Sequence, residues 1–379
     1  MKNIIIIIPM LLLVTIVNAQ WIQDSSCNKK AKIVANQAIE YLTNLEYLPA
    51  LGAAESALLL DEDCGCAKLT LAAISSQNPE WGSRLNKLNE INASKLSSEE
   101  KAWYDYLTAP NNKQDRLQKS LQNKFPNSPL LHFLGTSIQD FTSYKVFAEK
   151  FPSYAASAYN MLSYGYMSGA FGDKNLAEAK KYVEMSQKLH NGPNSFDSMG
   201  EHYASVGEYD KALEVQLKAI DFATFASPYG INAQLYRAKK SKDEISLIIL
   251  ESQKTMQDCI LKGDYESYKK FEHPEITVTS GDSNLNPFYV FTGDNINSEA
   301  PMTWNAFDLS NMKVYFSPDM KSSVVTFDAD GSFILNGSKD TIEYATRGSA
   351  TWVSTTDGWK ILHSSFAPRK GKKGLPQLD

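Results

Sequence analysis

The chain lacks the short motifs that mark common catalytic sites. It contains no glycine-rich phosphate loop, no Gly-x-Gly-x-x-Gly, no His-Glu-x-x-His and no nucleophile elbow. These absences argue against nucleotide-binding proteins, zinc proteases and α/β-hydrolases of the familiar kinds. We therefore predict no catalytic residue, no metal ion and no cofactor.

An excess of charge and long apolar runs are also missing. The 379 residues carry a net charge of −5, and the basic run from Arg369 to Lys373 is short and terminal. A solvated flexible tail over residues 369–379 is therefore expected in place of a nucleic-acid site. Beyond the first 19 residues, no stretch is apolar enough to span a bilayer. We predict no nucleic-acid partner and no membrane span.

The N-terminus has the pattern of a secretory signal peptide over residues 1–19. Met1-Lys2-Asn3 is a short basic region, Ile4 to Val17 is apolar, and Val17-Asn18-Ala19 offers small residues before a cleavage point at Gln20. The apolar run is shorter than the ~20 residues that a membrane span needs. The residue directly after the cleavage point is Gln20 and not a cysteine, which argues against a lipid anchor. We expect an exported protein, either periplasmic or secreted.

Cysteine is scarce, with four in the whole chain. In an oxidising compartment Cys27, Cys64 and Cys66 are disulfide candidates, and the pairing of Cys27 with either of the other two is left open. Cys64 and Cys66 lack the Cys-x-x-Cys spacing of redox-active pairs. A zinc site would need two further ligands, and no histidine lies nearby in the sequence. Cys259 falls in an apolar helical pattern and is expected in a core.

From Cys27 to about Lys240 the sequence predicts helices throughout. Residues 31–45 place apolar side chains three and four positions apart, as in an amphipathic helix. Lys124-Phe125-Pro126 and Lys150-Phe151-Pro152 each put a proline where one helix ends, because proline cannot donate a backbone hydrogen bond. The pattern predicts an all-α domain over residues 20–242, with roughly five or six helix pairs.

The clearest repeat unit covers residues 196–219. A first helix carries large residues and a glycine, and a second carries small residues: Phe196, Met199, Gly200, Tyr203, Ala212 and Ala219. This stretch resembles a tetratricopeptide repeat (TPR), with Gln216 standing where a bulky apolar residue is expected. The resemblance implies a solenoid whose concave face holds a protein or peptide partner. Tyrosines form one candidate surface, although most tyrosines at helical spacing fill gaps between helices: Tyr154, Tyr159, Tyr164, Tyr166, Tyr203 and Tyr209.

After Lys242 the pattern changes class. Residues 243–261 predict one long amphipathic helix, and residues 265–271 predict a shorter one. From Glu275 onward, β-branched and aromatic residues predict antiparallel strands, separated by turns such as Asp330-Gly331, Asn336-Gly337 and Asp357-Gly358. The predicted strands cover residues 276–278, 288–291, 312–316, 322–327, 341–354 and 359–366.

The second domain closes with two adjacent strands, residues 350–353 and residues 357–363, the latter reading Asp-Gly-Trp-Lys-Ile-Leu-His. A long helix, a short helix and such strands resemble the nuclear transport factor 2-like fold, in its SnoaL-like and ketosteroid-isomerase-like branches. The resemblance covers residues 243–368 and implies an α+β cone, a curved antiparallel sheet wrapped on helices around an apolar pocket. Because members include both enzymes and binding modules, two functions stay open. One is a scaffold or binding protein; the other is an isomerase, dehydratase or cyclase acting on a small apolar molecule.

Strand alternation predicts which residues line the inside of the cone. Pairing Thr355 with Trp359 would set His363 opposite Thr351. One face then carries the pocket candidates: His363, Arg347, Glu343, Ser365 and Ser349. His363 would serve as a base or ligand donor, and Arg347 would bind a carboxylate. In the alternative interpretation both residues only stabilise the shell, with Arg347 paired to Glu343.

The same register places large side chains on the outside of the sheet. The outward set is Lys360, Leu362, Ser364, Phe366, Trp352, Ala350, Tyr344 and Ile342. A large apolar surface of this kind usually marks an interface, and the resemblance implies dimerisation through this face. We therefore predict a homodimer through the second domain, or else packing of the helical repeats on the same surface.

Overall fold

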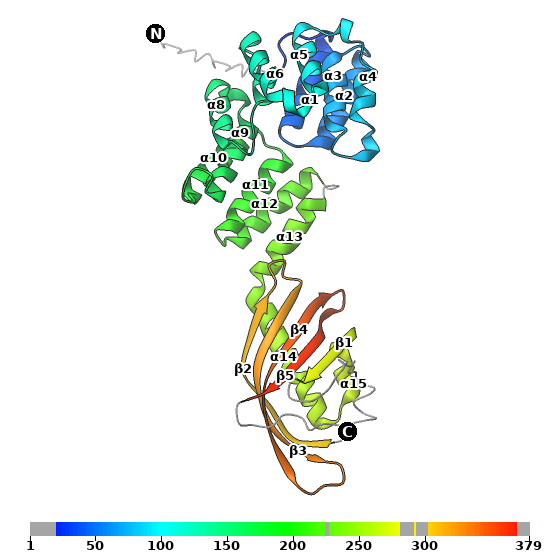
Figure 1. Ribbon diagram of the computed structural model, residues 1–379, viewed down its shortest axis with the longest axis vertical. Helices are drawn as coiled ribbons and strands as arrows, with labels where there is room; N and C mark the ends of the chain where they lie inside the picture. The colour runs from blue at the N-terminus through cyan, green and yellow to red at the C-terminus, as the bar shows by residue number, and fades with distance from the viewer. Residues whose placement is uncertain (1–19, 224–226, 281–291, 293–301, 370–379) are drawn as a thin grey trace, which may run out of the picture. The chain divides into compact units, whose positions relative to one another are not determined.

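The computed structural model describes residues 20–223, 227–280, 292 and 302–369. The chain divides into two compact units, Met1–Ala233 and Gln234–Asp379. The first unit is helical, and the second joins helices to a five-stranded sheet (Figure 1). The predicted signal peptide, the predicted strand at 288–291 and residues 370–379 of the predicted tail lie outside the described residues. Within the described ranges, no helix combines the length and apolar character needed to cross a membrane.

The first unit is built from helices joined by short connections. α1 packs with α2, α9 with α10 and α11 with α12. α6 ends at Lys124 and α8 at Lys150, which confirms both predicted stops before a Phe-Pro pair. The α-helices are α1 (Lys29–Thr43), α2 (Tyr47–Leu60), α3 (Gly65–Ile74), α4 (Arg84–Asn89), α5 (Ser98–Thr108), α6 (Asn111–Lys124), α7 (Pro129–Phe133), α8 (Phe141–Lys150), α9 (Ala156–Ser168), α10 (Leu176–Leu189), α11 (Pro193–Ser205), α12 (Tyr209–Phe222) and α13 (Ser227–Lys240), the last crossing the division between the units.

The pair α11–α12 packs as the repeat pattern predicts. Phe196 and Met199 are buried on α11, and Ala212 and Ala219 are fully buried on α12. Small residues on one helix let the other approach closely, and large residues fill the remaining space. Gln216, which departs from the pattern, is also fully buried, and the helix pair therefore contains a polar group that needs a hydrogen-bond partner.

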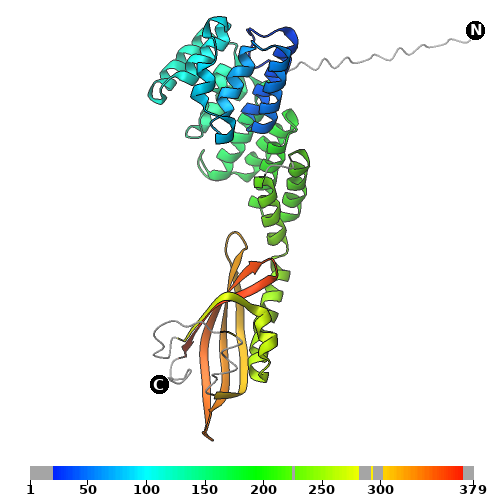
Figure 2. The ribbon, with the colours of Figure 1, turned by 90° about the vertical axis from the view of Figure 1, so that its right-hand side faces the viewer.

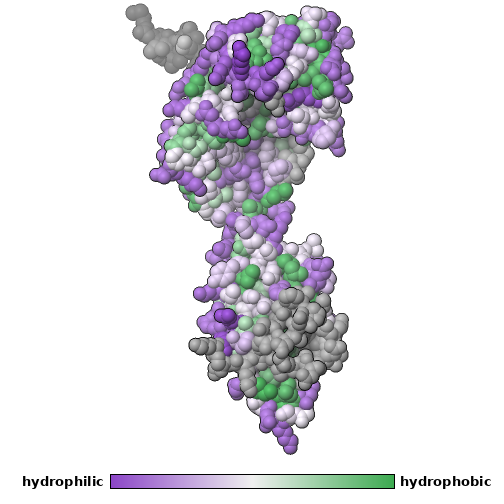
Figure 3. Space-filling model, in the orientation of Figure 1, coloured by the Kyte–Doolittle hydropathy of each residue, from purple (hydrophilic) through white to green (hydrophobic). Residues whose placement is uncertain are grey.

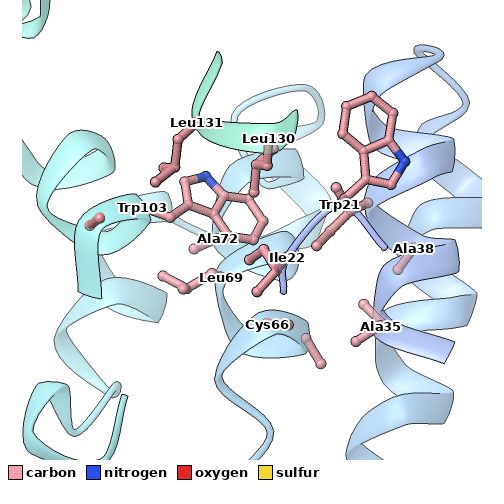
Figure 4. Packing of buried hydrophobic residues seen from close by; sticks show 14 of the residues in the cluster. Trp21, Ile22, Ala35, Ala38, Cys66, Leu69, Ala72, Trp103, Leu130 and Leu131 are labelled. Carbon is pink, nitrogen blue, oxygen red and sulfur yellow. The ribbon is translucent and has the colours of Figure 1, made fainter. Parts of the chain in front are cut away.

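The core of the first unit forms around the segment that follows Gln20. Trp21 stacks on Phe147 with ring centroids 6.3 Å apart, and Ile22 is fully buried beside it (Figure 4). The carboxylate of Glu99, at the start of α5, accepts hydrogen bonds from the backbone N–H of Gln23 at 2.8 Å and of Asp24 at 2.9 Å. The segment is thus held by apolar packing and by a buried carboxylate.

A disulfide joins Cys27 to Cys64, which is one of the two pairings left open by the sequence. Cys66 and Cys259 are buried free thiols. The bridge ties the segment after Gln20 to the residue that precedes α3. It therefore adds a covalent constraint where Glu99 already binds the backbone.

The second unit packs a long helix along one face of a mixed sheet (Figures 1 and 2). Its order is β1-β5-β4-β3-β2; β1 runs parallel to β5 and the other neighbours are antiparallel. The prediction of an antiparallel sheet is therefore wrong at this edge, because the intervening strands supply the long crossover that a parallel pair requires. The elements are α14 (Lys242–Lys262), α15 (Tyr265–Tyr268), β1 (Glu272–Ser280), β2 (Met302–Phe316), β3 (Ser322–Leu335), β4 (Thr341–Thr355) and β5 (Gly358–Pro368).

The predicted turn at Asp330-Gly331 is wrong, because both residues lie inside β3. A Cβ atom on Gly331 would collide with the carbonyl oxygen of Ala306 on β2. The register between β2 and β3 is irregular next to Ala306. Glycine at this position therefore allows two strands to approach closely, and it does not mark a turn of the chain.

The predicted faces are also wrong for β4 and for the end of β5. Trp352, expected outside, is fully buried, and its Nε1–H donates to Oε1 of Gln253 on α14 at 2.9 Å. Thr355 pairs with Gly358 in place of Trp359, and an irregularity after Thr351 restores the predicted pair of Thr351 with His363. The tighter turn reverses which side chains of β4 face the core. Others of the set predicted outside are buried or pack on the core: Ala350, Tyr344, Ser364, Ile342 and Phe366.

Candidate functional site

The predicted pocket residues lie on the sheet face that points away from α14. Buried residues of β3 such as Val325 and Phe327 face the core, and the residues between them face the other way. On that other face, neighbouring strands bring polar residues into two rows: Thr326, Ser349 and Ser365, then Asp328, Arg347 and Ala367. Together with Asn311 these rows line a cavity of about 430 Å³, which we call the sheet cavity.

The sheet cavity holds groups of both charges. Arg347 is exposed and sits opposite Asp328 in the ladder, and Nδ2 of Asn311 donates to Oδ2 of Asp328 at 2.8 Å. His363 and Glu343, the other two predicted residues, do not line the cavity. The sequence missed Asn311 because its left-handed backbone, at φ 52°, lies in a part of β2 with few strand-forming residues.

Large side chains fill the opposite side of the sheet. Among the described residues, Trp352, Phe333 and Ile249 are fully buried there. They occupy the place where the resemblance implied an apolar pocket. The described chain therefore offers a polar cavity on the sheet face that points away from α14 and a packed core on the other face.

A second polar set lies on the helices of the first unit, and we call it the acidic strip: Tyr164 on α9, Asp197, Ser198 and Glu201 on α11, and Asn232 on α13. The hydroxyl of Tyr164 donates to Oγ of Ser198 at 3.1 Å. Oδ1 of Asp197 accepts two amide hydrogen bonds, from Gln216 at 2.7 Å and from Asn232 at 3.1 Å. Gln216, the residue that departs from the repeat pattern, therefore holds the carboxylate of Asp197 on the neighbouring helix in one orientation.

The carboxylates of the acidic strip lie one helical turn apart and are half-buried. Burial raises the pKa of Glu201, and the nearby charge of Asp197 raises it further. Burial and the charge of Glu201 likewise raise the pKa of Tyr164. Among the ion pairs of the described residues, none includes Asp197 or Glu201. A cation placed beside them would relieve this excess of negative charge.

The tyrosines of the predicted surface do not act together. Some pack against other aromatic rings, and Tyr164 belongs to the acidic strip. Tyr166 stacks on Tyr182 with ring centroids 5.4 Å apart, and Tyr154 meets the edge of Trp21. Tyr164 reaches the acidic strip. Figure 3 shows hydrophilic residues over much of the visible face of the first unit, with apolar residues scattered among them.

A buried ion pair fixes the N-terminal end of α11, the helix that carries both carboxylates of the acidic strip. Nε2 of His190 lies 2.9 Å from Oε2 of Glu46, and Nδ1 lies 3.5 Å from Oε1 of Glu40. Burial alone would lower the pKa of His190, but its hydrogen bonds to both carboxylates raise it to about 9. Glu46 also accepts a hydrogen bond from the backbone N–H of Asn194 at 3.3 Å. A Cβ on Gly192 would strike the carboxylate of Glu46 and the ring of His190, so a larger residue would displace this pair.

No protein-family model and no curated protein matches the chain. Solved structures resemble parts of it. An NTF2-like protein from Cytophaga hutchinsonii is 16% identical over 32% of this chain and 96% of its own, with a TM-score of 0.28. The CaMKII association domain of C. elegans is 15% identical over 34% of this chain and 95% of its own, with a TM-score of 0.26. A thermophilic TPR protein from Thermus thermophilus is 16% identical over 55% of this chain and 98% of its own, with a TM-score of 0.25.

Proposed function

We propose that this chain is an exported scaffold or binding protein that holds a basic segment of a protein partner on the acidic strip. The observation that carries the proposal is the pair of half-buried carboxylates, Asp197 and Glu201, which have no ion-pair partner among the described residues. The enzyme alternative in the second unit has less support, because the side of the sheet expected to hold an apolar substrate is packed with side chains.

The chemistry of the acidic strip favours lysine or arginine side chains. Two amides fix Oδ1 of Asp197, so this carboxylate is oriented before a partner arrives. Half-burial weakens the screening of charge by water, so an ion pair here contributes more than one on an open surface. The hydroxyl of Tyr164 offers a further polar contact at the edge of the strip. A basic peptide would thus meet oriented acceptors on neighbouring helices.

Binding of labelled peptides tests this proposal. The peptides share one backbone sequence and carry lysine, norleucine or glutamate at alternate positions. We expect fluorescence anisotropy to show binding of the lysine peptide only, weakening as salt rises. Asp197→Asn should weaken this binding by at least about fivefold, or ~1 kcal/mol.

Asp221→Asn is the matched control, because Asp221 is exposed near the end of α12 and lies outside the acidic strip. It removes the same charge from the same unit and should leave the affinity unchanged. If both variants lost the same affinity, the effect would come from the change in net charge and not from the acidic strip. Equal binding of lysine and norleucine peptides would end the proposal.

Export forms the other half of the proposal, and it is supported by the apolar run Ile4 to Val17 and the small residues before Gln20. Expression of the full chain in a bacterium with a general secretory system should yield a mature protein that starts at Gln20. Intact-mass measurement of the periplasmic and cytosolic fractions checks this outcome. A full-length cytosolic product, with no processed form, would contradict it.

A further inference from the structure

The thiol of Cys66 lies beside the disulfide, and a buried carboxylate contacts both. Oε1 of Glu100 is 3.1 Å from Sγ of Cys66 and 3.8 Å from Sγ of Cys27. These atoms all lie within 4.8 Å of one another, and Cys64 is bonded to Cys27. Cys64, Cys66 and Glu100 are fully buried, while Cys27 is half-buried. Sulfur and carboxylate ligands from distant parts of the sequence thus converge on one point.

Glu100 is held in place by its own hydrogen bonds. It is the third residue of α5 and completes a capping box with Ser97. Its Oε2 accepts backbone N–H groups from Ser26 at 3.1 Å and Ser97 at 2.9 Å, and its Oε1 accepts that of Cys66 at 2.8 Å. These donors stabilise the ionised carboxylate and fix its direction toward the sulfurs. Metal-binding carboxylates in proteins are supported by hydrogen bonds in the same way.

We propose that reduction of the Cys27–Cys64 disulfide creates a binding site for a thiophilic divalent metal ion such as Zn²⁺. The ligands would be the thiolates of Cys27, Cys64 and Cys66 and the carboxylate of Glu100. Zinc binds sulfur at ~2.3 Å and carboxylate oxygen at ~2.0–2.2 Å, so tetrahedral ligands lie ~3.6–3.8 Å apart. The separation of 3.8 Å between Glu100 and Sγ of Cys27 agrees with this spacing, and the separation of 3.1 Å from Sγ of Cys66 is shorter, as suits the hydrogen bond of the metal-free thiol.

The disulfide and the metal ion exclude each other. A dithiol reductant supplies two electrons and two protons, the S–S bond breaks, and Cys27 and Cys64 become thiols while the reductant becomes a disulfide. Binding of the ion then releases the protons of the coordinating thiols. Exchange with the oxidised form of the dithiol would run the reaction backwards: that reagent takes up the two electrons and is reduced, the bond between Cys27 and Cys64 forms again, and the ion loses two ligands.

The surroundings of the cluster meet the other needs of a metal site. Oγ of Ser25 lies 3.4 Å from Sγ of Cys66 and donates toward Glu100 at 3.3 Å. Ser25 and Cys27 are only half-buried, which gives the ion a path from solvent on this side. The spacing of the cysteines alone did not predict the site, because Glu100 is supplied by a helix that begins beyond Cys66 in the sequence.

Titration with Co²⁺ tests the inference on the full chain. Thiol counting in denaturant first confirms the two states, with two free thiols before reduction and four after it. We expect the phosphine-reduced protein to bind one Co²⁺ per chain and to show sulfur-to-cobalt charge-transfer absorption. The oxidised protein should show neither. Competition by Zn²⁺ should remove the absorption.

Cys66→Ser should weaken Co²⁺ binding to the reduced protein by at least about tenfold, and Cys64→Ser provides a second ligand variant if the first folds poorly. Circular dichroism verifies folding in each case. Cys259→Ser is the control, because this thiol belongs to the second unit. It should bind Co²⁺ as the unchanged protein does. The proposal is overturned if the reduced protein shows no charge-transfer absorption, or if Cys66→Ser and Cys64→Ser bind like Cys259→Ser.

Discussion

Replacing Trp352 by alanine is expected to lower the free energy of unfolding of the second unit by about 3–5 kcal/mol, the usual cost of removing a fully buried aromatic side chain. Trp352 is fully buried between β4 and α14, and its ring meets the edge of Phe271. Its loss would also leave Oε1 of Gln253 without its donor. Urea unfolding followed by hydrogen exchange of peptides from β3 to β5 measures the effect within the full chain.

Thr351→Ala is the matched control, since this neighbour on β4 is half-buried and pairs with His363 at the ladder position next to the irregularity. It should cost less than about 1 kcal/mol. Trp352→Phe should fall between the two, because one aromatic ring is retained while the hydrogen bond and part of the buried indole are lost. If Trp352→Ala and Thr351→Ala unfold at the same urea concentration, Trp352 does not lie in the core.

The predicted homodimer loses the reason that was given for it. That prediction required Trp352, Tyr344 and Phe366 to face outward, whereas the first two are buried and Phe366 packs on the core. The exposed side of the same strands carries Ser349 and Arg347. Self-association through this face therefore remains a prediction without an apolar surface to support it.

Helices were predictable because their signal is local. The long helix expected over residues 243–261 is α14, Lys242–Lys262, and the shorter one expected over 265–271 is α15 with the 3₁₀ turn after it. Apolar spacing places the long helix, and the glycine at position 263, which has φ 68°, marks where it ends and the shorter helix can begin. The alternating pattern of helix pairs in the first unit follows from the same local evidence.

Sheet faces were not predictable, because alternation has a period of two and depends on an exact register. One residue fewer in the turn after Thr355 set Trp352, which was expected outside, opposite Ile361 and in the core. The compensating irregularity after Thr351 leaves no mark in the sequence. Arg347, Ser349 and Ser365 were correctly placed together by alternation, but the side of the sheet on which they lie was not.

The sites of the first unit could not be predicted for a different reason. Glu100 meets Cys66 across the fold, Gln216 meets Asp197 from the paired helix, and His190 meets Glu46 over a sequence separation of 144. Each residue alone has an ordinary surrounding sequence. Buried polar groups gain partners only when the chain folds, and such contacts carry no periodic signal.

His190 should give the first unit a stability that is lost in alkaline solution. Its pKa in the folded protein is about 9, above the ordinary value of 6.5 for an unfolded chain. A raised histidine pKa means that the folded state binds the proton more tightly, so the stabilisation is complete below pH ~6.5 and declines as the pH rises through 9. A difference of this size corresponds to about 3 kcal/mol.

The difference in free energy of unfolding between the unchanged protein and His190→Gln isolates this group from other groups that titrate in the same range. It should be largest at pH 6 and smaller by about 3 kcal/mol at pH 10. His202→Gln is the control: His202 is also buried, on α11, but burial lowers its pKa. Its stabilisation is complete above pH ~6.5 and is lost only as the pH falls, so its difference should stay flat from pH 7 to 10. If the difference for His190→Gln did not change with pH, the ion pair with Glu46 would not stabilise the protonated ring of His190. The N-terminal end of α11 would then be held to Glu46 only by the hydrogen bond from Asn194.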